Sequence, residues 1–175
     1  MSTQYGACDG TNSGMKLVEP SMAYDLPIQA FRREYLESGD SMDGGASLRE
    51  FERTQDWLDQ LEPQTSQFIY IREADDTVAG VIQIRHRFNA FLEKYAGHIG
   101  YCVRPSERCK GYATQMLARV LPECKRLGID DVLVCCLDDN EGSRRTILAN
   151  GGVYESTVFE PKSQSRIERY WIHLP

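Results

Sequence analysis

Residues 98–121 constrain the fold most, because they join a strand pattern to a helix pattern through a short basic turn. Residues 98–103 form an apolar, strand-like run that ends at Arg104-Pro105. Apolar residues then recur at the spacing of one helix face, at Ala113, Met116, Leu117, Val120 and Leu121. The pattern predicts a strand, a turn and a helix in direct succession, with Pro122 kinking or interrupting the helix.

The turn over residues 104–113 has the composition of an anion site. The first N–H groups of a helix have no partner inside the helix, and the helix dipole is positive there. Gly111 and Ala113 would let a phosphate approach the backbone, while Arg108 and Lys110 add positive charge. A basic helix cap that binds no ligand would have the same composition, so this alternative stays open. The glycine patterns of dinucleotide-binding folds and P-loops do not occur.

The rest of the chain predicts one mixed α/β domain over residues 15–175, after a loose extension over residues 1–14. The predicted order is β-α-α-β-β-β-α-β-α-β-β. Strands are expected at residues 16–19, 67–72, 78–87, 98–103, 129–137, 153–159 and 166–174, and flanking helices at 23–37, 47–61 and 140–148. Residues 47–50 have the form of a capping box, and residues 38–45 that of a flexible loop.

Charge and cysteine usage exclude several classes of protein. The net charge of −6 and a pI of about 5.1 argue against nucleic acid or an anionic membrane as the main partner, and suit cationic acceptors such as amines. No apolar run approaches the length of a membrane span, and no signal peptide is recognisable. The six cysteines form no framework, which favours a reducing cytoplasm, and the three dispersed histidines suggest no metal site.

The turn, read as R-x-x-G-x-A from Arg108 to Ala113, resembles the acyl-CoA pyrophosphate loop of the GNAT acetyltransferase superfamily. The element order is similar to that of the superfamily over residues 15–174. The segments HRFN at 86–89, GHIGYCVRPSER at 97–108 and RYWI at 169–172 resemble a bacterial subgroup of predicted acetyltransferases. The resemblance implies a mostly antiparallel central sheet with one splayed parallel strand pair, which admits the pantetheine arm of acetyl-CoA.

The resemblance also implies a set of cofactor-binding residues on the central strand, the turn and the last helix. Asn140 matches an asparagine that contacts pantetheine in the superfamily, although a helix N-cap explains its position equally well. The implied cofactor-binding set is Cys102, Val103, Arg108, Cys109, Lys110, Gly111, Tyr112, Ala113, Thr114, Asn140 and Ser143.

The chain departs from the superfamily at its catalytic positions. Ile147 stands where many members have a tyrosine that protonates the leaving thiolate, and Gly97 falls near their glutamate base. His98 is therefore the first candidate base and His86 the second, because an unperturbed imidazole titrates near neutral pH. Each has an alternative: His98 as a hydrogen-bonding residue across the sheet, and His86 as a structural residue beside Asn89. Backbone N–H groups near Cys102 and Val103 are the expected oxyanion donors.

Three functions remain open at this point. The first is N-acetyl transfer from acetyl-CoA to a primary amine of a small molecule or peptide, by direct attack in a ternary complex. The second is a non-catalytic acyl-CoA-binding module, and the third is an unrelated phosphate-binding protein with the same anion site. Expected partners are acetyl-CoA and an amine-bearing acceptor in the cytoplasm, with a homodimer left open.

Overall fold

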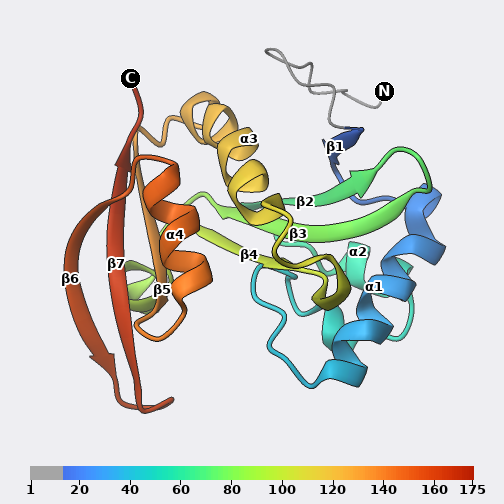
Figure 1. Ribbon diagram of the computed structural model, residues 1–175, viewed down its shortest axis with the longest axis horizontal. Helices are drawn as coiled ribbons and strands as arrows, with labels where there is room; N and C mark the ends of the chain where they lie inside the picture. Colours follow the sequence, from blue (N-terminus) through green and yellow to red (C-terminus); the bar gives the residue numbers. More distant parts are fainter. Residues whose placement is uncertain (1–13) are drawn as a thin grey trace.

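The computed structural model describes residues 14–175, so the extension predicted over residues 1–14 lies outside the described residues except for Gly14. A seven-stranded sheet has the order β1-β2-β3-β4-β5-β7-β6, and every neighbouring pair is antiparallel except β4 and β5 (Figure 1). The strands are β1 Met15–Val18, β2 Thr65–Arg72, β3 Thr77–Arg85, β4 Ile99–Val103, β5 Asp131–Leu137, β6 Val153–Glu160 and β7 Ser165–His173. The predicted fold class and element order are confirmed.

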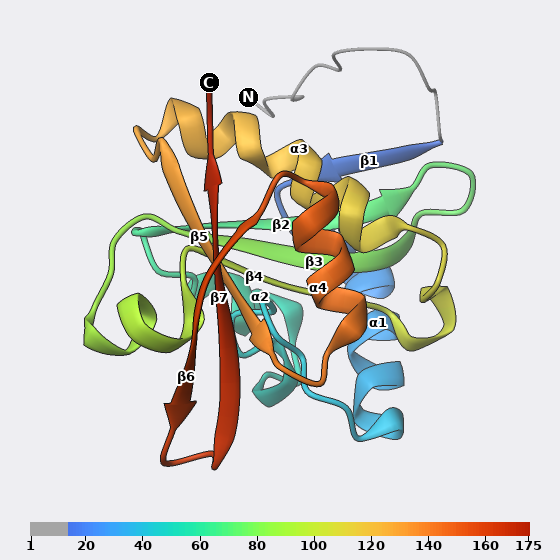
Figure 2. The ribbon, with the colours of Figure 1, turned by 60° about the vertical axis from the view of Figure 1, so that its left-hand side comes forward.

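Two pairs of helices cover opposite faces of the sheet (Figures 1 and 2). The helices α1 (Asp25–Ser38) and α2 (Thr54–Asp59) pack on one face, while α3 (Tyr112–Arg126) and α4 (Glu141–Ala149) pack on the other. Alternation along the strands supplies both cores, since Ile69 packs under α1 and its neighbour Phe68 under α3. The sheet is therefore buried on both faces where the central strands lie.

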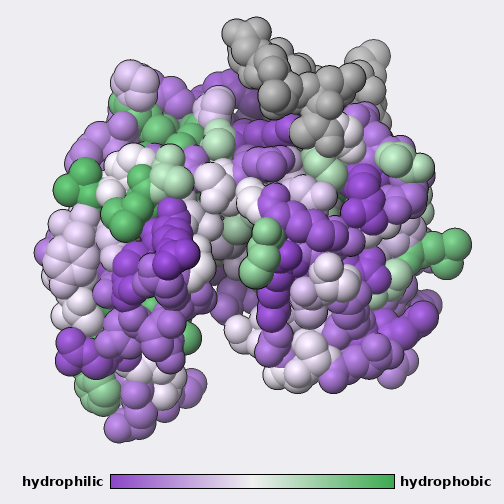
Figure 3. Space-filling model, viewed as in Figure 1, coloured by the Kyte–Doolittle hydropathy of each residue, from purple (hydrophilic) through white to green (hydrophobic). Residues whose placement is uncertain are grey.

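The parallel strands β4 and β5 separate almost as soon as they meet. Their only register pair is Ile99 with Val134. His98 fastens the two strands next to this pair, because its N–H donates to the Leu133 carbonyl at 2.8 Å and its Nδ1 accepts from the Leu133 N–H at 2.9 Å. Figure 3 shows the molecule hollowed between the part that carries β5–β7 and the part that carries β1–β4.

The local structure differs from the expectation at Ser47, in the loop before it and at Pro122. Ser47 does not cap a helix, because its backbone is left-handed (φ 61°) and α2 begins only at Thr54. The predicted flexible loop instead packs on β4, with Gly44 so close that a Cβ there would lie 2.1 Å from the Gly100 carbonyl oxygen. The helix α3 runs through Pro122, so the alternative of a break there was wrong, while the kink stays a prediction. In the described part of the chain, no helix is long and apolar enough to cross a membrane.

Candidate active site

Among the described residues, the edge of β4 that faces the gap pairs with β5 only at Ile99, which leaves main-chain N–H groups beyond it without a neighbouring strand. The Arg85 N–H donates to the His98 carbonyl at 2.7 Å, and the Arg104 N–H donates to the Ala79 carbonyl at 2.8 Å. Because antiparallel partners alternate between bonded and non-bonded pairs, the even-numbered residues of β4 bond to β3. The N–H groups of Tyr101 and Val103 therefore point into the gap. The N–H of Cys102 points to β3, so Tyr101 replaces it beside Val103 as the main-chain donor.

The turn after β4 shapes the start of α3 into a cradle. Cys109 (φ 62°) and Gly111 (φ 78°) both adopt left-handed backbone, and α3 begins immediately afterwards at Tyr112. No side chain caps this helix, so the first N–H groups stay available to a ligand. The space above Gly111 is open, because the nearest heavy atom to a Cβ built there is Gln115 Nε2 at 3.9 Å. A helix start that is uncapped and unobstructed in this way can accept an anion such as a phosphate.

The basic side chains of the turn are already paired with carboxylates. Arg108 Nη1 lies 2.7 Å from Asp40 and Lys110 Nζ lies 2.8 Å from Glu107. Burial raises the pKa of Glu107, but hydrogen bonds from Lys110 and Arg72 bring it below its usual value. Both cations remain nearly half exposed, at 45% and 47%. Such surface pairs are weak and can be exchanged for a phosphate, so the fixed part of the anion site is main-chain.

Helix α1 holds this turn from the other face of the sheet. Glu34 accepts from Arg104 Nε at 2.5 Å and from the Ser106 N–H at 2.6 Å. The Tyr35 hydroxyl donates to the Val103 carbonyl at 2.6 Å. The end of β4 is thereby fixed by the helix that covers the opposite core.

The other predicted residues lie at the starts of α3 and α4. Tyr112 packs its ring against Tyr70, and Thr114 Oγ1 lies 3.5 Å from Thr146 Oγ1. Asn140 Oδ1 accepts from the Ser143 N–H at 3.0 Å, which confirms the N-cap alternative, while its contact with pantetheine stays a prediction. Ser143 Oγ lies 2.7 Å from the Tyr101 hydroxyl, across the gap.

The two histidines lie in different surroundings. His98 is 8% exposed, and burial together with the nearby Arg85 charge lowers its pKa to about 4. Because Nδ1 accepts from Leu133, the neutral ring carries its proton on Nε2 and has no vacant lone pair. His86 Nε2 is 2.8 Å from Ser66 Oγ, on the sheet face opposite Gln67. The bond to Leu133 counts against His98 as a base, and the role of His86 stays a prediction.

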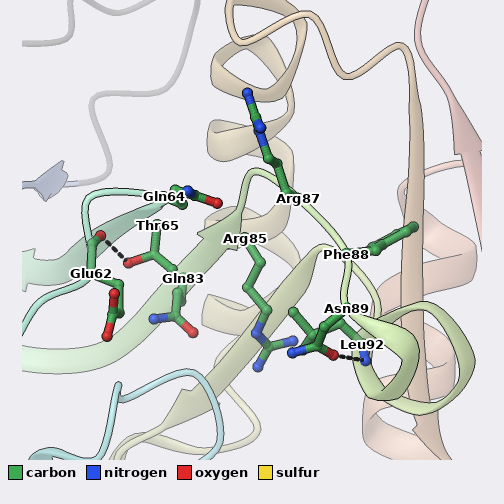
Figure 4. A pocket seen from close by; sticks show the side chains of 9 residues that line it. All are labelled: Glu62, Gln64, Thr65, Gln83, Arg85, Arg87, Phe88, Asn89 and Leu92. Carbon is green, nitrogen blue, oxygen red and sulfur yellow. Dashed lines mark hydrogen bonds between the residues drawn. The ribbon is translucent and has the colours of Figure 1, made fainter.

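A groove that the sequence did not predict lies on the α1–α2 side of β3. One cavity of about 410 Å³ is lined by Glu62, Gln64, Thr65, Gln83, Arg85, Arg87, Phe88, Asn89 and Leu92 (Figure 4). A second of about 270 Å³ shares Glu62 and Gln83 with it and extends towards α2. The available signal was the pair of polar residues, Gln83 and Arg85, on one face of an otherwise apolar strand.

Comparison with known proteins agrees with this geometry. Ribosomal-protein-S5-alanine acetyltransferase from Vibrio fischeri has a TM-score of 0.72 at 12% identity, over 99% of this chain and 96% of that one. Microcin C7 self-immunity acetyltransferase MccE, in complex with acetyl-CoA and AMP, has a TM-score of 0.69 at 17% identity. The match covers 93% of this chain and 94% of that one. RimL, a ribosomal L7/L12 alpha-N-protein acetyltransferase in complex with coenzyme A, has a TM-score of 0.68 at 13% identity. The match covers 91% of this chain and 94% of that one.

At these identities the solved structures establish the fold alone. No curated protein matches the chain by sequence. The profile of the acetyltransferase (GNAT) family, however, matches residues 28–151, which is most of the chain and includes β4, the turn and α4. The chain therefore belongs to the GNAT acetyltransferase family.

Proposed function

We propose that the protein transfers an acetyl group from acetyl-CoA to a primary amine of a small molecule or peptide. The observation that carries the proposal is the continuity of the gap with the turn. The unpaired N–H groups of Tyr101 and Val103 lead along β4 to the uncapped start of α3 at Gly111. A pantetheine arm can add to this edge as an extra strand does, with its pyrophosphate in the cradle.

In this arrangement the amine attacks the thioester carbonyl directly from the α1–α2 side. Burial raises the pKa of both thiols near the gap, Cys102 and Cys135, to about 12. Both therefore stay protonated near neutral pH and are poor nucleophiles, which argues against an acyl-cysteine intermediate. The N–H groups of Tyr101 and Val103 are donors for the developing oxyanion.

The absence of a tyrosine at Ile147 is compatible with catalysis. An alkyl thiol has a pKa of about 8.5, so the departing thiolate needs little help from an acid near neutral pH. Burial raises the pKa of Tyr101 to about 12, which makes its hydroxyl an unsuitable donor to such a thiolate. We assign the return of this proton to water.

The base role predicted for His98 is replaced in this proposal by a positioning role. The ring bonds Leu133 and so fixes where β4 and β5 begin to separate. The amine proton passes to water, because the Nδ1 of His98 is engaged and His86 lies on the other face. A non-catalytic acyl-CoA-binding module is the second candidate, favoured by the same absence of a free imidazole.

Two measurements test the proposal. Acetyl-CoA should raise the melting temperature, because a ligand that binds only the folded state stabilises it by mass action, whereas ATP should not. A panel of primary amines should then release free CoA thiol at a rate that depends on the amine. Binding without thiol release from any amine would favour the non-catalytic module. No thermal shift with acetyl-CoA would contradict both.

A further inference from the structure

Arg85 is a half-buried cation with unused hydrogen-bond donors beside the groove. Its Nη1 donates to the Ala96 carbonyl at 3.1 Å and to the Gly97 carbonyl at 3.2 Å. Nε and Nη2 have no acceptor in the described part of the chain. Neither is among the buried polar atoms without a partner, so both reach solvent. The guanidinium is thus held through one nitrogen and presents the other two.

No carboxylate neutralises this guanidinium directly. Among the described residues, none of the ion pairs within 4.0 Å includes Arg85, and Asp43 acts on it only at longer range. Most other arginines around the site are paired, as Arg104 is with Glu34 and Arg169 with Glu155. A cation withdrawn from water without a paired anion is unfavourable, which makes Arg85 receptive to an anionic group from outside.

The guanidinium also lies at the point where the strands separate. A Cβ built on Gly100 would lie 2.7 Å from Nη2 of Arg85. Gly100 follows Ile99, the one residue of β4 that pairs with β5. Gly100 therefore leaves room for the arginine directly beside the gap. Figure 4 shows the side chain between Gln83 and Asn89, facing the cavity of about 410 Å³. That volume is within the range of small-molecule pockets.

We propose that Arg85 binds a carboxylate of the acceptor, so that the acceptor is a small amino acid-type molecule with an amine and a carboxylate close together. This inference rests on the proposed function and specifies its substrate class. The two free nitrogens match the two oxygens of a carboxylate in a fork. With the carboxylate at Arg85, an amine a few bonds away reaches the start of the gap.

The experiment compares amino acids with their own carboxamides at a pH at which both amines are neutral, so that the two acceptors differ only in the anionic group. In the thiol-release assay, the wild type should prefer the carboxylate by roughly 10- to 100-fold in kcat/KM. Arg85→Gln should bring this ratio close to one without changing the affinity for CoA. Arg85→Lys, which keeps the charge but loses the fork, should give an intermediate ratio.

A matched control and a binding assay separate the outcomes. Arg33→Gln removes a charge from an exposed arginine on α1 that lines neither cavity, and it should keep the ratio. Melting temperatures identify variants that fail to fold, and for these Arg85→Lys carries the test. If no acceptor turns over, calorimetry with the CoA-bound protein measures the same ratio. If the CoA-bound protein binds carboxylates more tightly than carboxamides but turns over neither, the result would contradict catalysis and support the anion site. Equal use of both forms by the wild type, or an unchanged preference in Arg85→Gln, would overturn the inference.

Discussion

In the proposed function, the two sides of the sheet recognise ligands by different means. On the donor side, formed by the β4 edge, the turn and the start of α3, the candidate contacts come from main-chain N–H groups. On the acceptor side, formed by the groove of Glu62, Gln83 and Arg85, they come from side chains. Main-chain recognition depends on backbone shape and tolerates most side chains. Side-chain recognition changes with each substitution, so the acceptor side can vary while the donor side stays constant.

The largest expected effect tests the donor side. Gly111→Val should abolish measurable CoA binding, because valine is strained at φ 78° and its side chain would occupy the cradle. The protein should still fold, since no heavy atom lies closer than 3.9 Å to a Cβ at this position. Calorimetry with CoA and a thermal melt measure the two properties separately.

Gly128→Val is the matched control for this change. Gly128 follows the other end of the same helix, has φ 77° and has no heavy atom within 4 Å of its Cβ position. Its replacement should destabilise the fold by about 1–2 kcal/mol through backbone strain and leave CoA affinity unchanged. Unchanged affinity in Gly111→Val would place the pyrophosphate elsewhere, and an equal loss in both variants would mean that strain alone explains the effect.

The same division explains what could be predicted from the sequence. Strand alternation, helix spacing and the glycine-containing turn are local, and they predicted the element order and the position of the turn before α3. Arg85 and Gln83 lie on the acceptor side because the fold brings them close to Gly100 and to residues of the loop before β2. No local sequence pattern encodes that contact. The contact of the loop at residues 38–45 with β4 could not be predicted for the same reason, since it depends on the close approach of Gly44 to Gly100.

His98 shows how a predictable location can come with a chemical environment that the sequence does not reveal. Its place on the central strand was predictable, but its engagement by Leu133 depends on a neighbouring strand 35 residues away in sequence. A histidine that titrates near neutral pH in isolation is shifted here by burial. Ser47 is similar, because the capping-box pattern is present and the left-handed backbone prevents its use.

The next effect in size tests the role of His98, which links the two sides. His98→Ala leaves the Leu133 N–H without its acceptor, destabilises the fold by about 1–3 kcal/mol and should lower kcat by about 10²-fold through misplacement of β4. His98→Asn offers an amide oxygen near the position of Nδ1 and cannot titrate in this range. If the residue positions β4, Asn should restore most of kcat and leave its pH profile unchanged.

If His98 were the general base, the kinetics of the same two variants would differ from this expectation. Both Ala and Asn would then lower kcat by about 10²–10⁴-fold and remove one limb of the pH profile. Comparison at two amines of different pKa excludes titration of the acceptor itself. Loss of the limb in His98→Asn would restore the original assignment of His98 as the base and contradict the positioning role.

The smallest expected effect is on stability, and it needs no substrate. The folded-state pKa of His98, about 4, is below its ordinary value of 6.5, so the unfolded chain takes up the proton first as the pH falls. The stabilisation is complete above about 6.5 and is lost progressively down to about 4, by at most about 3 kcal/mol. Protonation would also direct an Nδ1–H at the Leu133 N–H and add charge beside Arg85.

Urea denaturation of the wild type and His98→Asn across this pH range isolates the contribution of the histidine, because all other titrating groups are shared. The wild type should lose stability relative to the variant as the pH falls. Parallel curves would mean that the ring titrates normally and that its bond to Leu133 does not hold it neutral.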